Sequence, residues 1–166
     1  MRIREKFTAR FAVMAVAAFA AIALATVACA SAPSANPAGM QDALNVEWIL
    51  AEIRTEDGTI VMDRVGNAAL FGDIFTLRLD GAMAYGTAMP NTFRGPYSLG
   101  PNGEITFGPM ASTLMAAFME PEELSEHEFF VFLYNAFMWD LRDGNFELYA
   151  TDDFGGEAVL VFVVND

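Results

Sequence analysis

Apolar and polar residues alternate at a period of two along much of the chain. In residues 75–80, Phe, Leu and Leu alternate with Thr, Arg and Asp, and residues 146–150 repeat the pattern. Such alternation is typical of a β-strand with one buried face. Residues 158–164 are apolar on both faces. We therefore expect a strand there that is covered on both sides.

Short turn signals separate these runs. Asx-Gly pairs supply the positive φ angles that tight hairpins need, and hairpins join antiparallel neighbours. A looser fifth turn is expected at residues 154–156, where Phe precedes two glycines. The four pairs are Asp57-Gly58, Asp80-Gly81, Asn102-Gly103 and Asp143-Gly144. The sheet is thus predicted to be antiparallel.

One segment, residues 121–138, lacks turn signals and predicts a single main helix packed against the sheet. Ser125 followed by Glu128 has the spacing of a capping box. Apolar residues then recur at helical spacing and form one expected buried face, with a second apolar edge beside it. The face is Phe130, Leu133, Tyr134 and Phe137, and the edge is Phe129 and Phe132.

The start of the chain has the layout of a secretory signal peptide. Residues 1–10 are basic, residues 11–28 carry no charge, and the chain's one cysteine, Cys29, follows. This arrangement resembles a bacterial lipoprotein signal, in which the cysteine takes a lipid, although Thr26 stands where an aliphatic residue is usual. We predict a signal peptide at 1–28, a flexible tether at 29–43 and a domain at 44–166. Ordinary cleavage after Ala30 or Ala32 is the alternative.

The charge of the chain excludes one class of partner. The formal net charge is −13, whereas nucleic-acid binding depends on clustered Lys and Arg. Beyond the basic start, the positive residues are scattered arginines: Arg54, Arg64, Arg78, Arg94 and Arg142. We expect no nucleic-acid partner. Because anionic lipids would also be repelled, membrane attachment must be covalent or hydrophobic.

Three motifs in the domain resemble those of the META domain family, which includes HslJ-like heat-shock proteins. They are an opening Trp-x-Leu, a central Gly-x-x-x-x-Asn-x-Phe-x-Gly-x-Tyr, and a Met-Ala-Ser-Thr-x-Met run. The match covers about residues 47–164. The residues that carry it are Trp48, Gly86, Asn91, Phe93, Gly95, Tyr97, Met110, Ser112, Thr113 and Met115.

The resemblance implies an α+β fold, in which an antiparallel β-sheet curls into a partly open barrel packed by one main helix. It also implies an exported or envelope-associated protein linked to stress. We expect the motif residues to build the fold, since Gly and Asn at such positions usually serve backbone geometry. The family's two cysteines fall on Pro90 and Ala117 here, which removes any disulfide or redox role for that pair.

The sequence offers little for catalysis. His127 is the only histidine and lies in the acidic start of the predicted helix, where a solvated or capping role is expected rather than that of a base. The acidic pair Asp152-Asp153 could supply oxygen ligands to Ca²⁺, but the EF-hand spacing is missing. We predict no enzyme activity, no cofactor and no metal site.

The chain is rich in Phe and Met, which raises the question of an exposed apolar site. Met115, Phe118 and Met119 precede the predicted helix and form a candidate apolar groove between helix and sheet, although core packing explains most such residues. The leading functional hypothesis is a non-catalytic, lipid-anchored envelope protein that serves as a stress-linked binding or assembly module. The alternative is a carrier of a small hydrophobic ligand or peptide in the partial barrel.

Overall fold

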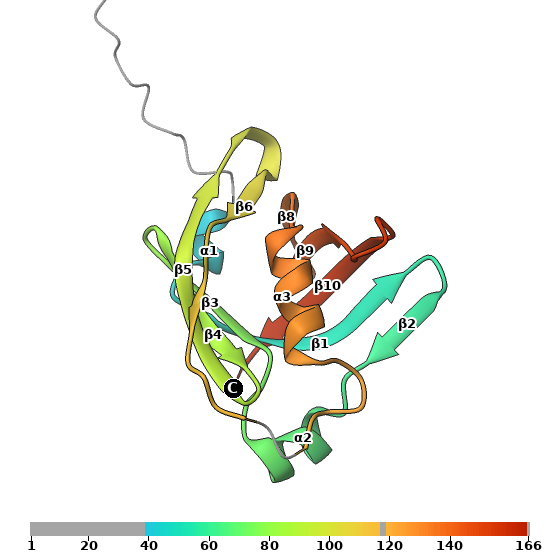
Figure 1. Cartoon of the computed structure of the whole chain (residues 1–166). Helices are drawn as coiled ribbons and strands as arrows, with labels where there is room; N and C mark the ends of the chain where they lie inside the picture. The colour runs from blue at the N-terminus through green and yellow to red at the C-terminus, as the bar shows by residue number, and fades with distance from the viewer. Residues whose placement is uncertain (1–38, 117–118, 166) are drawn as a thin grey trace, which may run out of the picture. The chain divides into compact units, whose positions relative to one another are not determined.

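In the computed structural model, residues 39–116 and 119–165 are described. Within these two ranges, three α-helices and a short 3-10 helix accompany the strands, and Figure 1 shows their arrangement. The helices are α1 (Met40–Ala43), α2 (Arg64–Phe71), η1 (Pro101–Gly103) and α3 (Glu126–Tyr134). The strands are β1 (Glu47–Thr55), β2 (Gly58–Val61), β3 (Thr76–Asp80), β4 (Met83–Ala88), β5 (Asn91–Leu99), β6 (Ile105–Phe107), β7 (Ala111–Ser112), β8 (Met138–Arg142), β9 (Asn145–Thr151) and β10 (Glu157–Val164).

The strands form one antiparallel sheet that curls into a nearly closed barrel. The order is β6-β5-β4-β3-β1-β10-β9-β8, with β2 paired to β1 and β7 paired to β5 outside this path. The two ends of the path meet at a single bridge between Glu104 and Met138. There the Ile105 N–H donates to the Phe137 carbonyl oxygen at 3.2 Å. The expected α+β fold with a partly open barrel is confirmed.

The turns lie where the sequence predicts them. Each Asx-Gly pair lies in or borders the connection between two strands that are consecutive in the chain. Positive φ angles occur at Gly81, Asn102, Asp143 and Gly144, and again at Gly155 in the looser fifth turn. These are conformations that Gly adopts freely and that Asn and Asp tolerate better than other residues.

Helix α3 packs against the concave side of the sheet and fills the barrel. Phe129 is fully buried, with its ring centroid 5.2 Å from that of Phe75 and 6.0 Å from that of Phe93. The prediction of the buried face is wrong in part, because Tyr134 and Phe137 are each 47% exposed. The helix ends at Tyr134, which is earlier than predicted. The predicted second edge, Phe129 and Phe132, faces the core instead.

The predicted capping box at the start of α3 is confirmed. The Ser125 hydroxyl accepts from the Glu128 N–H, while the Glu128 carboxylate accepts from the Ser125 N–H at 2.8 Å. The Ser125 hydroxyl donates to the same carboxylate at 2.7 Å. These bonds hold the pKa of Glu128 below its ordinary value, the hydroxyl contributing most.

Replacing Ser125 with alanine is expected to lower the free energy of unfolding by about 1 kcal/mol at neutral pH. A carboxyl whose pKa is lowered by folding stabilises the protein above its unfolded-state pKa, and this contribution disappears as the pH falls through the folded-state pKa. The difference between wild type and Ser125→Ala should therefore shrink as the pH falls from about 5 to about 3. Urea unfolding at a series of pH values measures it, and a difference independent of pH would contradict the assignment.

The structure also corrects one boundary and adds one helix. The predicted tether at 29–43 is too long, because Met40 and Ala43 belong to α1 and are fully buried. The Trp48 indole N–H donates to the Ala43 carbonyl oxygen, which fixes α1 on the barrel. Helix α2 was not expected, since its sequence, RVGNAALF, is short and contains a glycine.

Strand β10 differs from its prediction on one face. Its inward residues Ala158, Leu160 and Phe162 are buried as expected, whereas Val164 at its end is 43% exposed. No second layer covers the outward face among the described residues. Val161 is buried there by neighbouring side chains, whereas Val159 and Val163 are half-buried.

Residues 34–166 form one compact unit, which contains the hydrophobic core. This domain is therefore expected to fold without the segment before it. None of the helices among the described residues is both long and apolar enough to span a membrane. The predicted signal peptide, Cys29, Ala117 and Phe118 lie outside the described residues.

Candidate functional site

Asn91 is the centre of the family motif in the structure. It begins β5, is 4% exposed, and its carboxamide makes four hydrogen bonds. Its Nδ2 donates to the Met115 carbonyl at 3.2 Å and to the Glu126 carboxylate at 2.9 Å. Its Oδ1 accepts from the Thr113 hydroxyl at 2.8 Å and from the Met115 N–H at 2.7 Å. One side chain thus ties together β5, the segment after β7 and the first turn of α3.

Two motif glycines make room for two motif side chains. A Cβ on Gly86 would overlap the Thr76 carbonyl oxygen and lie 2.6 Å from the ring of Phe93. A Cβ on Gly95 would overlap the sulfur of Met110 and lie 2.9 Å from the Pro109 carbonyl oxygen. Both glycines therefore permit a close approach that any larger residue would prevent.

The remaining motif residues also contact their own domain. The Tyr97 hydroxyl donates to the Gly81 carbonyl oxygen at 2.9 Å, and burial raises the pKa of this phenol, as does the nearby Asp80. The Ser112 hydroxyl donates to the Thr113 carbonyl oxygen at 2.8 Å.

A shallow groove of about 480 Å³ lies over β4, β5 and β7 and includes several motif residues. Its lining consists of Tyr85, Gly86, Thr92, Phe93, Arg94, Ala111, Ser112 and Thr113. The hydroxyls of Ser112 and Thr113 are already engaged in hydrogen bonds within the domain. Tyr85, Thr92 and Arg94 supply the outward polar groups, which are too few to define a ligand.

The titratable residues considered for chemistry lie on the surface. The His127 side chain is 80% exposed, and its Nε2 is 3.7 Å from the Asp153 carboxylate. The Asp152 carboxylate accepts from the backbone N–H groups of Phe154 and Gly156, both at 2.8 Å, and so shapes the turn between β9 and β10. Within the described ranges, no group of three or more His, Cys, Asp or Glu residues is arranged to hold a metal ion.

A buried carboxylate on the outer face of the sheet was missed by sequence reasoning. Glu147 points outward from β9 yet is only 4% exposed, because Arg54, Arg142 and Tyr149 surround it. The Arg54 guanidinium donates to it at 2.9 Å and the Tyr149 hydroxyl at 3.0 Å. Burial and the contact with this carboxylate raise the pKa of Tyr149. The alternation of β9 predicts an exposed residue at 147, and no local pattern reveals a partner 93 positions away.

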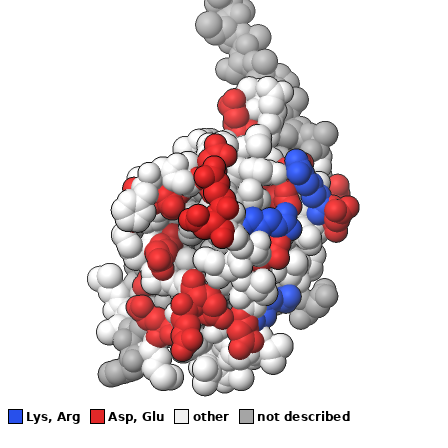
Figure 2. Space-filling model, turned by 90° about the vertical axis from the view of Figure 1, so that its right-hand side faces the viewer, with Lys and Arg blue, Asp and Glu red and all other residues white. Residues whose placement is uncertain are grey.

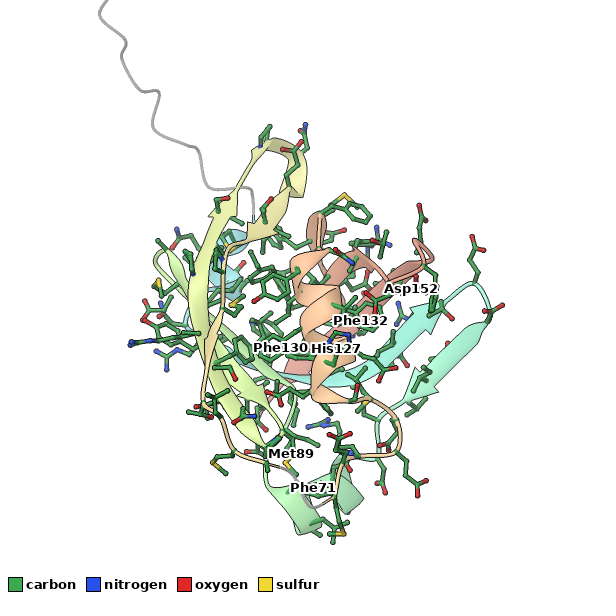
Figure 3. All side chains as sticks on the ribbon, viewed as in Figure 1. Phe71, Met89, His127, Phe130, Phe132 and Asp152 are labelled. Atoms are coloured by element: carbon green, nitrogen blue, oxygen red, sulfur yellow. The ribbon has the colours of Figure 1, made fainter. Side chains whose placement is uncertain are left out.

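Of the candidate groove predicted around Met115, Phe118 and Met119, the structure describes Met115 and Met119. Met115 and Met119 are 61% and 60% exposed. However, the space between α3 and the sheet is filled, since the rings of Phe130 and Phe93 stack edge to face at 5.4 Å. Figure 3 labels Phe130 on α3. The groove that includes Met119 has α2 as its other wall.

This groove, which we call the α2 groove, has a volume of about 300 Å³. Its walls are connected, because the Asp63 N–H donates to the Glu123 carboxylate at 2.9 Å. Asp63 also caps α2 by accepting from the Gly66 N–H. The residues that line it are Asp63, Gly66, Asn67, Leu70, Phe71, Met119, Glu120, Pro121, Glu122 and Glu123.

The lining of the α2 groove combines apolar and acidic side chains. Pro121 is buried and Phe71 is half-buried, whereas Leu70 and Met119 are exposed apolar residues. Four lining residues are acidic and none is Lys or Arg. Figure 2 shows acidic side chains gathered at the lower end of the domain, where α2 lies in Figure 1. The surface there is suited to a ligand that is both apolar and cationic.

Comparison with known proteins supports the fold. The model of the META domain family matches residues 41–164. An NMR structure of a protein from Burkholderia xenovorans is similar, with a TM-score of 0.55 and 22% sequence identity, over 78% of this chain and 90% of that chain. No curated protein matches the chain.

Proposed function

Because this chain belongs to the META domain family, we propose that it is an exported, lipid-anchored, non-catalytic binding or assembly module of the cell envelope, linked to stress. The observation that carries the binding role is the exposed apolar surface at the α2 end. Leu70 and Met119 line the α2 groove and are 68% and 60% exposed. Leu114 and Met115, a few residues before Met119 in the chain, are 100% and 61% exposed. Exposed apolar residues gathered in one region often indicate an interaction site.

The polar residues of the motif support a binding module rather than an enzyme. Asn91 and Thr113 hydrogen-bond within the domain, and His127 is exposed on α3, with its Nε2 3.7 Å from the Asp153 carboxylate. A nucleophile or base for catalysis needs neighbours that activate it. Within the described ranges, no such arrangement is associated with either groove.

Carriage of a hydrophobic ligand inside the barrel has less support. The inner face of the sheet is occupied by buried rings in mutual contact, including Phe129 with Phe162 at 6.5 Å and Phe146 with Phe162 at 6.1 Å. A carrier needs an enclosed apolar space of several hundred cubic ångströms. An external groove is the simpler place for a ligand.

The anchor is tested by mass spectrometry of the mature N-terminus. We expect wild-type protein to begin at Cys29 and to carry a lipid, because the signal layout places the cysteine where the apolar run ends. Cys29→Ala should lack the lipid, whereas the neighbouring substitution Ser31→Ala should retain it. An unmodified Ala or Ser at the N-terminus of the wild-type protein would refute the anchor.

A further inference from the structure

We propose that the α2 groove binds a cationic, amphipathic peptide segment of a partner protein. This inference rests on the proposed binding function and names the chemistry of the partner. It concerns the surface between α2 and residues 119–123, which is separate from the motif residues around Asn91.

The apolar side chains of the α2 groove are exposed to water. Leu70 is 68% exposed and Met119 is 60% exposed, on opposite walls of the same groove. Apolar side chains placed in this way gain free energy when a partner removes them from water. Methionine is also suited to contact with varied apolar surfaces, because its side chain is flexible and polarizable.

The charge of the groove sets the sign of the charge expected on the partner. Asp63, Glu120, Glu122 and Glu123 line the groove, and Arg64 lines a separate small cavity instead. Glu120 and Glu122 are exposed, and neither forms an ion pair with another described residue. A peptide with Lys or Arg beside its apolar residues would place those charges against these carboxylates.

The polar floor of the groove favours a peptide over a simple apolar cation. Asn67 is 8% exposed and lines both the groove and the adjacent small cavity. Its carboxamide forms no hydrogen bond with another described residue, and its polar atoms are open to solvent, since the Trp139 indole N–H is the one buried side-chain polar group without a partner in that part of the chain. An Asn side chain offers both a donor and an acceptor, which is the pair that a peptide backbone complements.

The test uses residues 34–166 and three synthetic twelve-residue peptides. Each has Leu residues at helical spacing, and the remaining positions are Lys in the first peptide, Glu in the second and Ser in the third. Fluorescence anisotropy at low and high salt measures affinity. We expect the Lys peptide to bind and the Glu and Ser peptides to bind at least about tenfold more weakly. The affinity of the Lys peptide should fall as salt rises.

Charge-matched variants separate the groove from the general negative charge of the domain. E120Q/E122Q removes two carboxylates from the groove, and E56Q/E157Q removes two exposed carboxylates elsewhere. We expect binding of the Lys peptide to weaken about fivefold in the first variant and to change less than about twofold in the second. Leu70→Ser should weaken it as well, without loss of folding, because Leu70 is exposed.

Equal weakening in the two charge variants would overturn the proposal, since it would show attraction by net charge alone. Equal binding of the Ser peptide would also overturn it. A third result would also overturn it: the domain self-associates, Leu70→Ser abolishes this association, and the Lys peptide does not compete with it. The groove would then be assigned to a second copy of the chain instead. None of these results affects the mass of the N-terminus, so failure here is distinguishable from failure of the proposed anchor.

Discussion

Replacing Gly86 with alanine is expected to destabilise the domain by about 3 kcal/mol, at the upper end of what overpacking usually costs. The new Cβ would overlap the Thr76 carbonyl oxygen of the neighbouring strand and press on the ring of Phe93. Neither can move freely, because Thr76 is paired with Ile49 of β1 and Phe93 packs against Phe129 and Phe130. Urea unfolding followed by tryptophan fluorescence measures the change.

Gly156→Ala is the matched control for this substitution. Gly156 also lacks a positive φ, and its added Cβ would meet only the Asp152 carboxylate, at 2.8 Å, in an exposed turn. That side chain lies in an exposed turn, where water can replace its bonds to two backbone N–H groups if it shifts, so a loss of only about 1 kcal/mol is expected. If Gly86→Ala were no worse than Gly156→Ala, the close approach of β4 to β3 would not be what requires glycine at position 86.

The elements best predicted from the sequence are those governed by local rules. The Asx-Gly turns and the capping box at Ser125 and Glu128 depend on residues within a few positions of one another, and both are found where expected. The period-two alternation of β3 and β9 identified their inward faces for the same reason. Closure of the barrel through Glu104 and Met138 depends on distant residues, and only the family resemblance indicated it.

The parts that sequence reasoning missed depend on tertiary contacts. Helix α2 has weak local signals, and Asp63 at its start is connected to Glu123 across 60 positions. Glu147 occupies an outward position in the alternating pattern of β9, which predicts an exposed side chain, yet Arg54 and Arg142 cover it. The candidate groove was predicted beside the main helix because the chain there is rich in Phe and Met. In the structure Phe129 and Phe130 fill that space, and Met119 faces α2 instead.

Replacing Asn91 with alanine is expected to destabilise the domain by about 3 kcal/mol, because the four hydrogen bonds of a buried carboxamide are lost together. The Met115 N–H loses its acceptor, so its exchange with solvent should become faster than that of the strand amides. Asn135→Ala is the control, since that exposed side chain makes a single hydrogen bond, to Thr151. Urea unfolding and amide hydrogen exchange measure these effects.

A loss no larger than that of Asn135→Ala, with the Met115 amide still protected, would mean that Asn91 does not hold the segment after β7 in place. Asn91→Asp should be at least as harmful as alanine, because a carboxylate cannot donate to the Met115 carbonyl and would lie against Glu126.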